Sequence, residues 1–301
     1  MKNITKVCIL LSGIFLVLGA ACITAGAFLG VTPSQLVHQS SYTDRFFTNK
    51  TPLFITGTAS EESHTFTDVE SLDLEVSMCD LTIYQHELDH IALTAQNVNS
   101  HFSCRQEGNT LVVKDDRPSS TKQNSMDDAL KLILYLPQKE MDEISMEVSL
   151  GEIFIEQMNA DTIDIECDLG SFQAEDLICR ELQFENNIGE VRFGQLQVSD
   201  SAKICTDTGD IELDLFEGPS LHTDCGIGNT VITASGAETD YNYKIDSQMG
   251  DSYVNHHHHT HRDDLDDIPD NTLTKDHHAG KNIEIQCGLG NITLNFTEES
   301  L

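Results

Sequence analysis

The sequence predicts an all-β fold: a parallel β-helix-like solenoid with coils of about 19–20 residues, preceded by one N-terminal transmembrane helix. Three observations predict it. A small anchor residue, usually Gly, recurs along the chain, apolar residues stand at fixed distances on both sides of it, and an uncharged apolar segment follows the first lysines. The anchors are Cys79, Gly151, Gly170, Gly189, Gly209, Gly228 and Gly290, with a weaker one at Gly250.

The first 31 residues predict a membrane anchor. Lys2 and Lys6 precede an uncharged, mostly apolar run from Val7 to Val31. As a helix this run would be about 37 Å long, which is enough to cross a bilayer with some tilt. Because positive charge stands only before the run, we expect the amino end in the cytoplasm and the rest of the chain outside it. A signal peptide that is cleaved near residues 25–27 is the alternative.

Beyond the anchor over residues 1–31 we expect a stalk over residues 32–65, a solenoid over residues 66–296 and a short tail over residues 297–301. Two polar stretches interrupt the repeats. The first, residues 115–128, has no apolar periodicity and predicts a loop. The second is a His- and Asp-rich insert over residues 255–279, which falls inside the long step from Gly250 to Gly290.

Each coil is predicted to contain strands on both sides of its anchor. Apolar residues stand seven and five positions before the anchor and two and four positions after it, an alternation typical of strands with one buried face. A third apolar position follows seven residues after the anchor. The residues before the anchors are Leu72, Leu74, Ile144, Met146, Ile163, Ile165, Leu182, Phe184, Tyr243, Ile245, Ile283 and Ile285. Those after the anchors are Leu81, Ile83, Ile153, Ile155, Phe172, Ala174, Val191, Phe193, Ile211, Leu213, Ile292 and Leu294, with Met158, Leu177, Leu196 and Phe216 at the third position.

Matching offsets predict coils that stack in register about 4.8 Å apart. We expect structural corners, where a positive φ or a tight bend excludes a Cβ, at Gly151, Gly170, Gly189, Gly209, Gly228, Gly250 and Gly290. In the Gly228 coil the run from Thr230 to Ile232 fits better after a shift of one residue, so a bulge is expected there. A meander of antiparallel hairpins or a β-sandwich is the alternative fold, and neither would need matched offsets.

The cysteines outside the predicted anchor are odd in number, which argues against a complete disulfide framework. Cys167, Cys225 and Cys287 each stand three residues before an anchor, and we expect them to be small inward-facing hydrophobic residues. Cys205 and Cys225 are the one pair expected to be able to form a disulfide. The sequence has no C-x-x-C spacing, so it indicates no thiol catalysis.

The insert carries the residues that the sequence suggests as metal ligands. Neutral imidazoles with nearby carboxylates bind zinc, nickel or copper. Adjacent histidines lack the fixed spacing that a folded tetrahedral site needs, so a solvated acidic surface insert is the alternative. The candidate zinc ligands are His256, His257, His258, His259, His261, His277 and His278. No other cofactor is expected.

The composition argues against several function classes. Against 50 acidic residues there are only 17 basic ones, and the formal net charge of −33 repels nucleic acid and anionic lipid headgroups. The absence of Trp weakens the hypothesis of a carbohydrate-binding protein. The chain has no G-x-S-x-G, H-E-x-x-H or phosphate-loop motif, so no catalytic residue is predicted and we expect no enzyme.

Several segments of the chain resemble a known family. The segment from Leu132 to Pro137, the run Gly151, Glu152 and Ile153, and coils of the form seen at residues 208–211 resemble the DUF4097 group. The resemblance covers residues 66–296, and the group consists of membrane-anchored β-strand-repeat proteins of Gram-positive bacteria with an adhesin label. It implies a β-helix-like extracellular domain, a single-pass location in the cell membrane and no catalytic residue.

The sequence therefore predicts a non-enzymatic cell-surface scaffold or adhesion-type binding module. We expect its N-terminal helix to hold it in the membrane and its ectodomain to meet a protein or cell-wall partner, and we expect no nucleic acid. A membrane-tethered sensor subunit for envelope stress or metal is the second hypothesis. A polysaccharide-active β-helix enzyme is the third, because such an enzyme needs a basic and aromatic groove and this chain has few basic residues and no Trp.

Overall fold

The computed structural model describes residues 61–116, 129–255, 257–259 and 272–298. The regular structure of these residues is β, apart from the short 3-10 helix η3 (Glu238–Asp240). No helix in these ranges has the length and apolarity that crossing a membrane requires. The anchor predicted over residues 1–31 lies outside the described residues.

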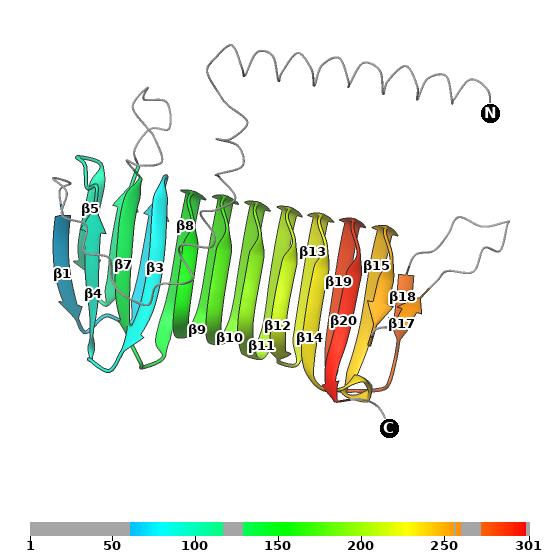
Figure 1. Ribbon diagram of the computed structural model, residues 1–301. Coiled ribbons are helices and arrows are strands. Elements are labelled where there is room, and N and C mark those ends of the chain that lie inside the picture. Colours follow the sequence, from blue (N-terminus) through cyan, green and yellow to red (C-terminus); the bar gives the residue numbers. More distant parts are fainter. Residues whose placement is uncertain (1–60, 117–128, 256, 260–271, 299–301) are drawn as a thin grey trace, which may run out of the picture. The chain divides into compact units, whose positions relative to one another are not determined.

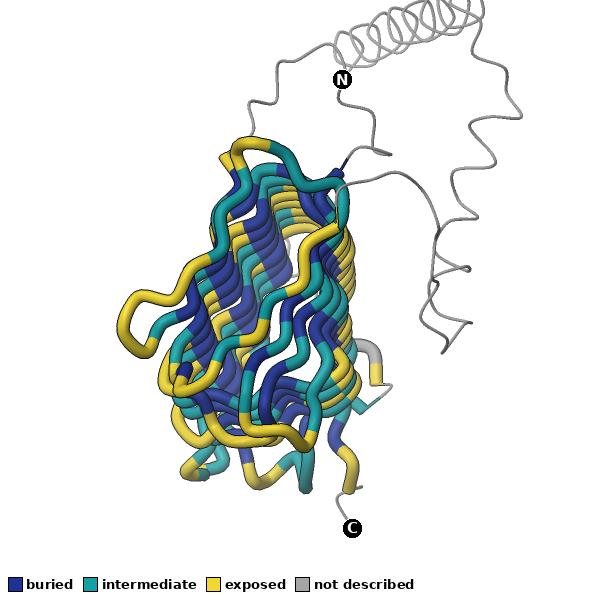
Figure 2. The backbone as a smooth tube through the Cα atoms, turned by 90° about the vertical axis from the view of Figure 1, so that its left-hand side faces the viewer, coloured by how far each residue is buried: buried dark blue, intermediate teal, exposed yellow. Residues whose placement is uncertain are grey.

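The strands form two facing sheets, face 1 and face 2, with the core between them (Figure 1, Figure 2). Three long strands, β9 (Ile153–Leu169), β10 (Phe172–Ile188) and β11 (Val191–Thr208), begin on face 2 and end on face 1. Face 1 also contains, in spatial order, β5 (Phe102–Glu107), β6 (Thr110–Asp115), β2 (Ser71–Val76) and β8 (Met141–Leu150) before these strands, then β13 (Ser220–Ile227), β19 (Lys281–Leu289), β15 (Tyr241–Met249) and β18 (Thr272–Lys275). Face 2 likewise contains β1 (Glu61–Thr67), β4 (His90–Gln96), β7 (Leu130–Pro137) and β3 (Cys79–His86), then β12 (Ile211–Glu217), β14 (Thr230–Ala237), β20 (Ile292–Glu298), β16 (Ser252–Val254) and β17 (His257–His259).

Each long strand makes most of one coil. Ile153 and Ile155 of β9 pair with β3 on face 2, and the residues from Ala160 onward pair with β8 on face 1. A corner glycine then returns the chain to face 2. The predicted all-β, solenoid-like stack is confirmed, and the meander and sandwich alternatives are excluded because the central strand pairs are parallel.

The predicted inward positions form the core. The apolar residues predicted at the five matched offsets are all buried, with Ile165, Phe184 and Phe193 fully inaccessible to solvent. The aromatic rings of Phe172 and Phe184, which come from opposite faces, lie 4.5 Å apart between their centroids. Such contacts between the faces bury the apolar area that stabilises a stack of short strands.

The one coil of 20 residues places its extra residue away from the glycine corner. The pairing of β10 with β11 runs from Cys179 opposite Val198 to Glu181 opposite Ser201, so β11 gains one residue at this bend. Both flanking parts of the ladder keep their register. The apolar residues on either side of the bend therefore still face the core.

Stack order differs from chain order at both ends. The last strands, β19 and β20, lie between the pair β13 and β14 and the pair β15 and β16 (Figure 1). At the other end, β2 and β3 lie between β6 and β7 on one side and β8 and β9 on the other. Antiparallel strands then cover each end: β1, β4 and β5 at one, β17 and β18 at the other. Such capping limits edge-to-edge association of open parallel sheets.

No bulge occurs at the Gly228 corner, so the shift expected for the run from Thr230 to Ile232 is wrong. The register shifts further along β14 instead, between the pair Leu213 and Ile232 and the pair Phe216 and Ala234. Thr230 pairs with Ile211 on one side and with Ile292 on the other, and it is buried at the usual inward position. Val231 points outward and is 38% exposed. Two neighbouring coils hold the backbone in register here, so the ladder overrides the better apolar fit of a shifted strand.

A single inward row stands three residues before the corners. Its members are Val76, Val148, Cys167, Asn186, Thr206, Cys225, Cys287 and Ser247. All of them are buried, as predicted for the three cysteines. The predicted pairing of Cys205 with Cys225 is wrong, because the register places Cys205 opposite Asp224 and Thr206 opposite Cys225. Cys225 instead faces Cys287 on β19.

Candidate binding surface

The corner glycines form a close-packed row along one edge of the stack, where the arrowheads of successive strands lie side by side (Figure 1). Their φ angles lie between +143° and +156°, a region that residues with a Cβ avoid. A Cβ on Gly189 would come within 1.8 Å of the carbonyl oxygen of Gly170, and the other corners are equally tight. The backbones of adjacent coils therefore touch, and only Gly fits between two such corners.

Cys79 occupies the equivalent corner position between β2 and β3, and its φ is not positive. Its outer neighbours among the described residues are Asp115, which pairs with Val76, and Leu130, which pairs with Cys79, and neither is a glycine. The requirement for Gly therefore ends where the repeating corners end.

The residue directly before each corner points outward and forms an exposed apolar row. In spatial order the row contains Leu150, Leu169, Ile188, Thr208, Ile227, Leu289 and Met249, which we call the apolar ridge. The large side chains from Leu169 onward are between 45% and 67% exposed, and Leu150 is half-buried at one end. Single exposed apolar residues are common, but a row of them interrupted by one Thr makes this edge the candidate binding surface.

The alternation of the strand breaks just before the corner. Strict alternation would turn the residue before the corner inward, but the two residues before each corner glycine are both exposed or half-buried. The glycine N–H groups also fix the ridge backbone. For example, Gly151 N donates to the carbonyl oxygen of Leu169, and Gly209 N donates to that of Ile227, in each case at 2.9–3.1 Å. The ridge side chains are thus displayed on a rigid, hydrogen-bonded edge.

Polar rows flank the ridge on both sides. On one side, carboxylates follow the corners at Glu152, Glu190, Asp210 and Asp251. On the other side Asp168 and Asp207 stand two residues before their corners. From residue 149 to residue 251 neither row contains a Lys or an Arg. The ridge is therefore an apolar stripe with four carboxylates along one border, two along the other and no basic residue in either.

Side-chain hydrogen bonds order part of the border that follows the corners. The Asp210 carboxylate accepts a hydrogen bond from the backbone N–H of Asn229 at 2.7 Å. The side-chain oxygen of Asn229 in turn accepts one from the backbone N–H of Asn291 at 3.1 Å. Asn291 continues the chain of contacts by accepting the N–H of Asp251 at 3.0 Å. These contacts hold the carboxylate of Asp210 and the backbone of Asp251 beside the ridge.

At the other end of this border, negative charge is crowded. Burial raises the pKa of the Asp80 carboxyl, although the backbone N–H of Glu152 and the Lys131 ammonium oppose the shift. Burial also raises the pKa of Glu152, and the charge of Asp80 raises it further. A cation placed at this border would relieve the repulsion between these two carboxylates.

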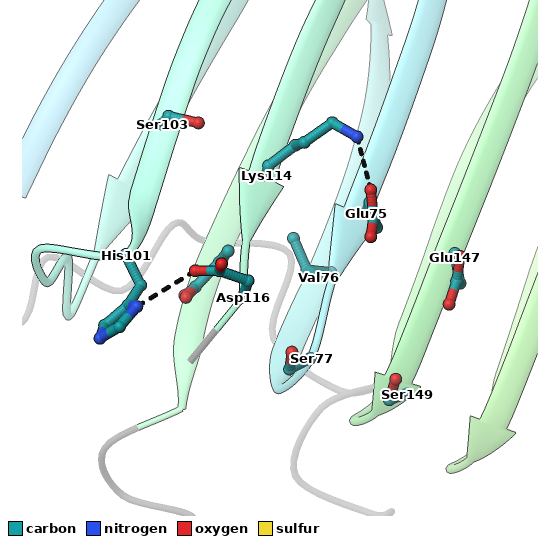
Figure 3. Close-up of a pocket in the computed structure, with 10 residues that line it drawn as sticks. Glu75, Val76, Ser77, His101, Ser103, Lys114, Asp116, Glu147 and Ser149 are labelled. Carbon is teal, nitrogen blue, oxygen red and sulfur yellow. Dashed lines mark hydrogen bonds and ion pairs between the residues drawn. The ribbon is translucent and has the colours of Figure 1, made fainter. Parts of the chain in front are cut away.

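A hollow of about 270 Å³ lies on face 1 near the β5 end of the stack (Figure 3). Lys114 of β6 pairs there with Glu75 of β2, and His101 Nδ1 lies 3.1 Å from Asp116 Oδ1. Glu147 and Ser149 of β8 line the opposite side. The paired side chains are between 38% and 85% exposed, so solvent screens both pairs.

The predicted metal ligands are only partly described. His256 and His261 lie outside the described residues, as do the side chains of His258 and His259. His257 is exposed at the start of β17, whereas His277 follows β18 with its ring 6.1 Å from that of Tyr243. His278 is exposed, and its Nδ1 atom lies 3.3 Å from Oδ1 of Asp276. Within the described ranges no group of three or more potential ligands could hold a metal ion.

Four of the described thiols lie in environments that keep them protonated, whereas a hydrogen bond with Cys225 lowers the pKa of Cys287. Burial raises the pKa of Cys104, Cys167 and Cys179 to about 12. A hydrogen bond with Cys287 and burial raise the pKa of Cys225. A thiol nucleophile needs a lowered pKa and access to solvent, which none of these four residues combines.

Sequence reasoning missed the apolar ridge. The signal was present, because Leu150, Leu169, Ile188, Ile227, Met249 and Leu289 all directly precede an anchor. A repeated apolar offset is ordinarily interpreted as a buried position. Only the exposure of these side chains in the folded chain shows that this offset faces solvent.

A family model described as "Toastrack DUF4097" matches residues 69–298. No curated protein matches the chain. Among solved structures, the chain is similar to a "putative cell adhesion protein" of Clostridium sporogenes, with 12% identity, 80% of this chain and 100% of that chain covered, and a TM-score of 0.40. It is also similar to a "putative adhesin" of Bacteroides fragilis, with 14% identity, 80% and 98% covered, and a TM-score of 0.43. It is similar as well to a "putative adhesin" of Parabacteroides distasonis, with 9% identity, 80% of this chain and 98% of that chain covered, and a TM-score of 0.46.

Proposed function

The chain belongs to the Toastrack DUF4097 family, and on this premise we propose that it is a non-enzymatic cell-surface scaffold that binds a partner along its apolar ridge. The scaffold supplies rigidity, since backbone hydrogen bonds join every coil to its neighbours. The ridge supplies the binding surface.

The continuous exposure of the ridge is the observation that carries this proposal. Leu169, Ile188, Ile227, Leu289 and Met249 present large apolar side chains on consecutive coils, with one Thr between them. Transferring such side chains from water into an interface is favourable at roughly 25 cal/mol per Å² of apolar area. A partner that covers the row would therefore gain free energy without a rearrangement of the scaffold.

The arrangement of polar groups supports a binding module in preference to an enzyme. The ion pairs of the hollow on face 1 are exposed, and the family description names no reaction. The alternative of a metal or envelope-stress sensor rests on the His-rich insert, and no observation in the described residues favours it. Nucleic acid is an unsuitable partner for a chain with a net charge of −33.

The cell membrane is the proposed location, with residues 7–31 as a single-pass anchor and the solenoid outside the cytoplasm. Protease added to intact protoplasts is expected to remove the solenoid and leave a short membrane fragment. Protoplasts lysed before digestion serve as the control. If the solenoid is digested only after lysis, the outward orientation is wrong.

The role of the ridge can be tested in intact cells by photo-crosslinking. A photoreactive amino acid at Leu169, on the ridge, is expected to give a discrete adduct with a partner. The same amino acid at Leu88, which is 56% exposed but lies off the ridge, is the matched control. Equal labelling at the two positions, or no adduct at Leu169, would contradict the proposal.

A further inference from the structure

We propose that the apolar ridge binds one cationic amphipathic helix of a partner protein, with the apolar stripe of the helix on the ridge and its basic residues beside the two acidic borders. This inference rests on the proposed function and names the chemistry of the partner.

The backbone of the ridge excludes strand addition as the mode of binding. Carbonyl oxygens along the ridge already accept hydrogen bonds from corner glycines, as Ile188 does from Gly170 and Leu289 does from Gly228, both at 2.9 Å. A partner strand would have no row of unsatisfied carbonyls with which to pair. Recognition must therefore come from side chains, which is how an amphipathic helix binds.

The dimensions of the ridge match a helix. Consecutive rungs are spaced at about 4.8 Å, and one turn of an α-helix rises about 5.4 Å. The six steps from Leu150 to Met249 span about 29 Å, which is the length of a helix of about 19 residues. A helix of this length makes about 5.3 turns against the six steps of the ridge, so its apolar stripe follows the row with an offset of about 0.6 Å per turn.

The charges beside the ridge select a basic helix. Glu190 and Asp210 border it on one side and Asp207 on the other, all with exposed side chains. Basic residues on both flanks of a helical apolar stripe would meet these carboxylates, whereas acidic ones would be repelled. The same borders disfavour a second copy of this chain, which would bring like charges together, and an anionic lipid surface.

One rung of the ridge already carries a polar residue, which suggests a conservative substitution for its neighbours. Thr208 occupies the central rung, so the backbone at this edge accepts a β-branched polar residue. Ile188→Thr combined with Ile227→Thr would extend this interruption to three adjacent rungs while leaving the core unchanged. Thr208→Ile would complete the row. The two variants should change affinity in opposite directions.

The test uses the full chain in detergent and synthetic helical peptides of about 19 residues with a leucine stripe flanked by lysines. Fluorescence anisotropy at several salt concentrations measures binding. We expect Ile188→Thr/Ile227→Thr to weaken binding by about tenfold and Thr208→Ile to strengthen it by about threefold. Circular dichroism and thermal melting of each variant check that the fold is retained.

Charge variants distinguish binding of the peptide at the acidic borders of the ridge from its general attraction to the acidic protein. Glu190→Gln combined with Asp207→Asn is expected to weaken binding several-fold and to reduce its salt dependence. Glu140→Gln combined with Glu217→Gln removes the same charge from the opposite edge of the stack and is expected to leave binding unchanged. Equal losses in the two double variants would show attraction to the whole acidic protein and would overturn the inference.

Peptides with glutamates in place of the lysines distinguish this inference from the proposed function. If both peptides bind equally and the ridge variant abolishes both, the ridge is a binding surface but its partner is not cationic. If the ridge variant changes neither peptide binding nor crosslinking at Leu169, the inference and the proposed function both fail. Ridge-dependent dimerisation in ultracentrifugation, or ridge-dependent binding to phosphatidylglycerol vesicles, would also overturn the helix as occupant.

Discussion

Cys225 and Cys287 lie opposite each other on neighbouring strands, and the Sγ atom of each lies 3.3–3.4 Å from the carbonyl oxygen of a corner glycine. Between them in the chain come η3, β15 and β16, which occupy the next position outward in the stack. The final coil is therefore an internal layer. Its removal should affect more than the end of the chain.

A chain that ends after Gly280 lacks β19 and β20. We expect β15 and β16 to lose their parallel partners and to become sensitive to limited proteolysis, whereas β8 to β11 keep both neighbours and stay protected. A chain that ends after Glu298 is the control, because it retains all described strands. Equal protection of residues 241–254 in the two chains would contradict the observed stack order.

Gly189→Ala tests the corner row. The new Cβ would lie 1.8 Å from the Gly170 carbonyl oxygen at a φ of +150°, so we expect the free energy of unfolding to fall by about 2–4 kcal/mol. Gly280→Ala is the control, since no atom lies within 4 Å of its added Cβ, and we expect a change within about 0.5 kcal/mol. Urea denaturation measures both. Similar values for the two variants would show that the corners tolerate a side chain.

Ile165→Asp tests the core between the faces. Ile165 is fully buried, and a carboxylate there has no partner, so we expect a loss of about 4 kcal/mol or more. Leu88→Asp, at a position that is 56% exposed, should cost less than about 1 kcal/mol. Thermal melting compares the two proteins. A stable, cooperatively folded Ile165→Asp protein would be incompatible with this core.

Asp80→Asn tests the crowded border through pH. Burial raises the pKa of Asp80 above its ordinary value of 3.8, so the folded state binds this proton more tightly than the unfolded state does. The charged carboxyl therefore destabilises the protein above its raised pKa, and this cost disappears as the pH falls below 3.8. We expect Asp80→Asn to raise the free energy of unfolding at pH 7, by about 1 kcal/mol or less, and to have little effect at pH 3.

Denaturation at several pH values checks this expectation, with Glu217→Gln on the opposite edge as the control. The amide oxygen introduced by Asp80→Asn can still accept the backbone N–H of Glu152, so the substitution removes charge and keeps the hydrogen bond. A destabilised Asp80→Asn protein at pH 7 would show that the carboxylate contributes favourable interactions that outweigh its desolvation.

Much of the coil could be predicted because its evidence is local and repeated. Ile163 and Ile165, or Phe172 and Ala174, alternate within one strand and face the core as their spacing predicts. The long insert and the Gly228 coil were harder to predict, since a single irregular unit has no repeated equivalent with which its pattern can be compared. Thr230 is buried against the local apolar pattern because Ile211 and Ile292 fix its register from both sides.

The sequence by itself determined the period, the inward offsets of the strands and the acidic surface, since these depend on side-chain identity at fixed spacing. Only the tertiary structure decided that the last coil lies inside the stack, that Cys225 faces Cys287 and that Ile188 and its equivalents point outward. Those features depend on which coils meet in space and on the break in alternation before the corners. Neither is encoded in the spacing of residues within one coil.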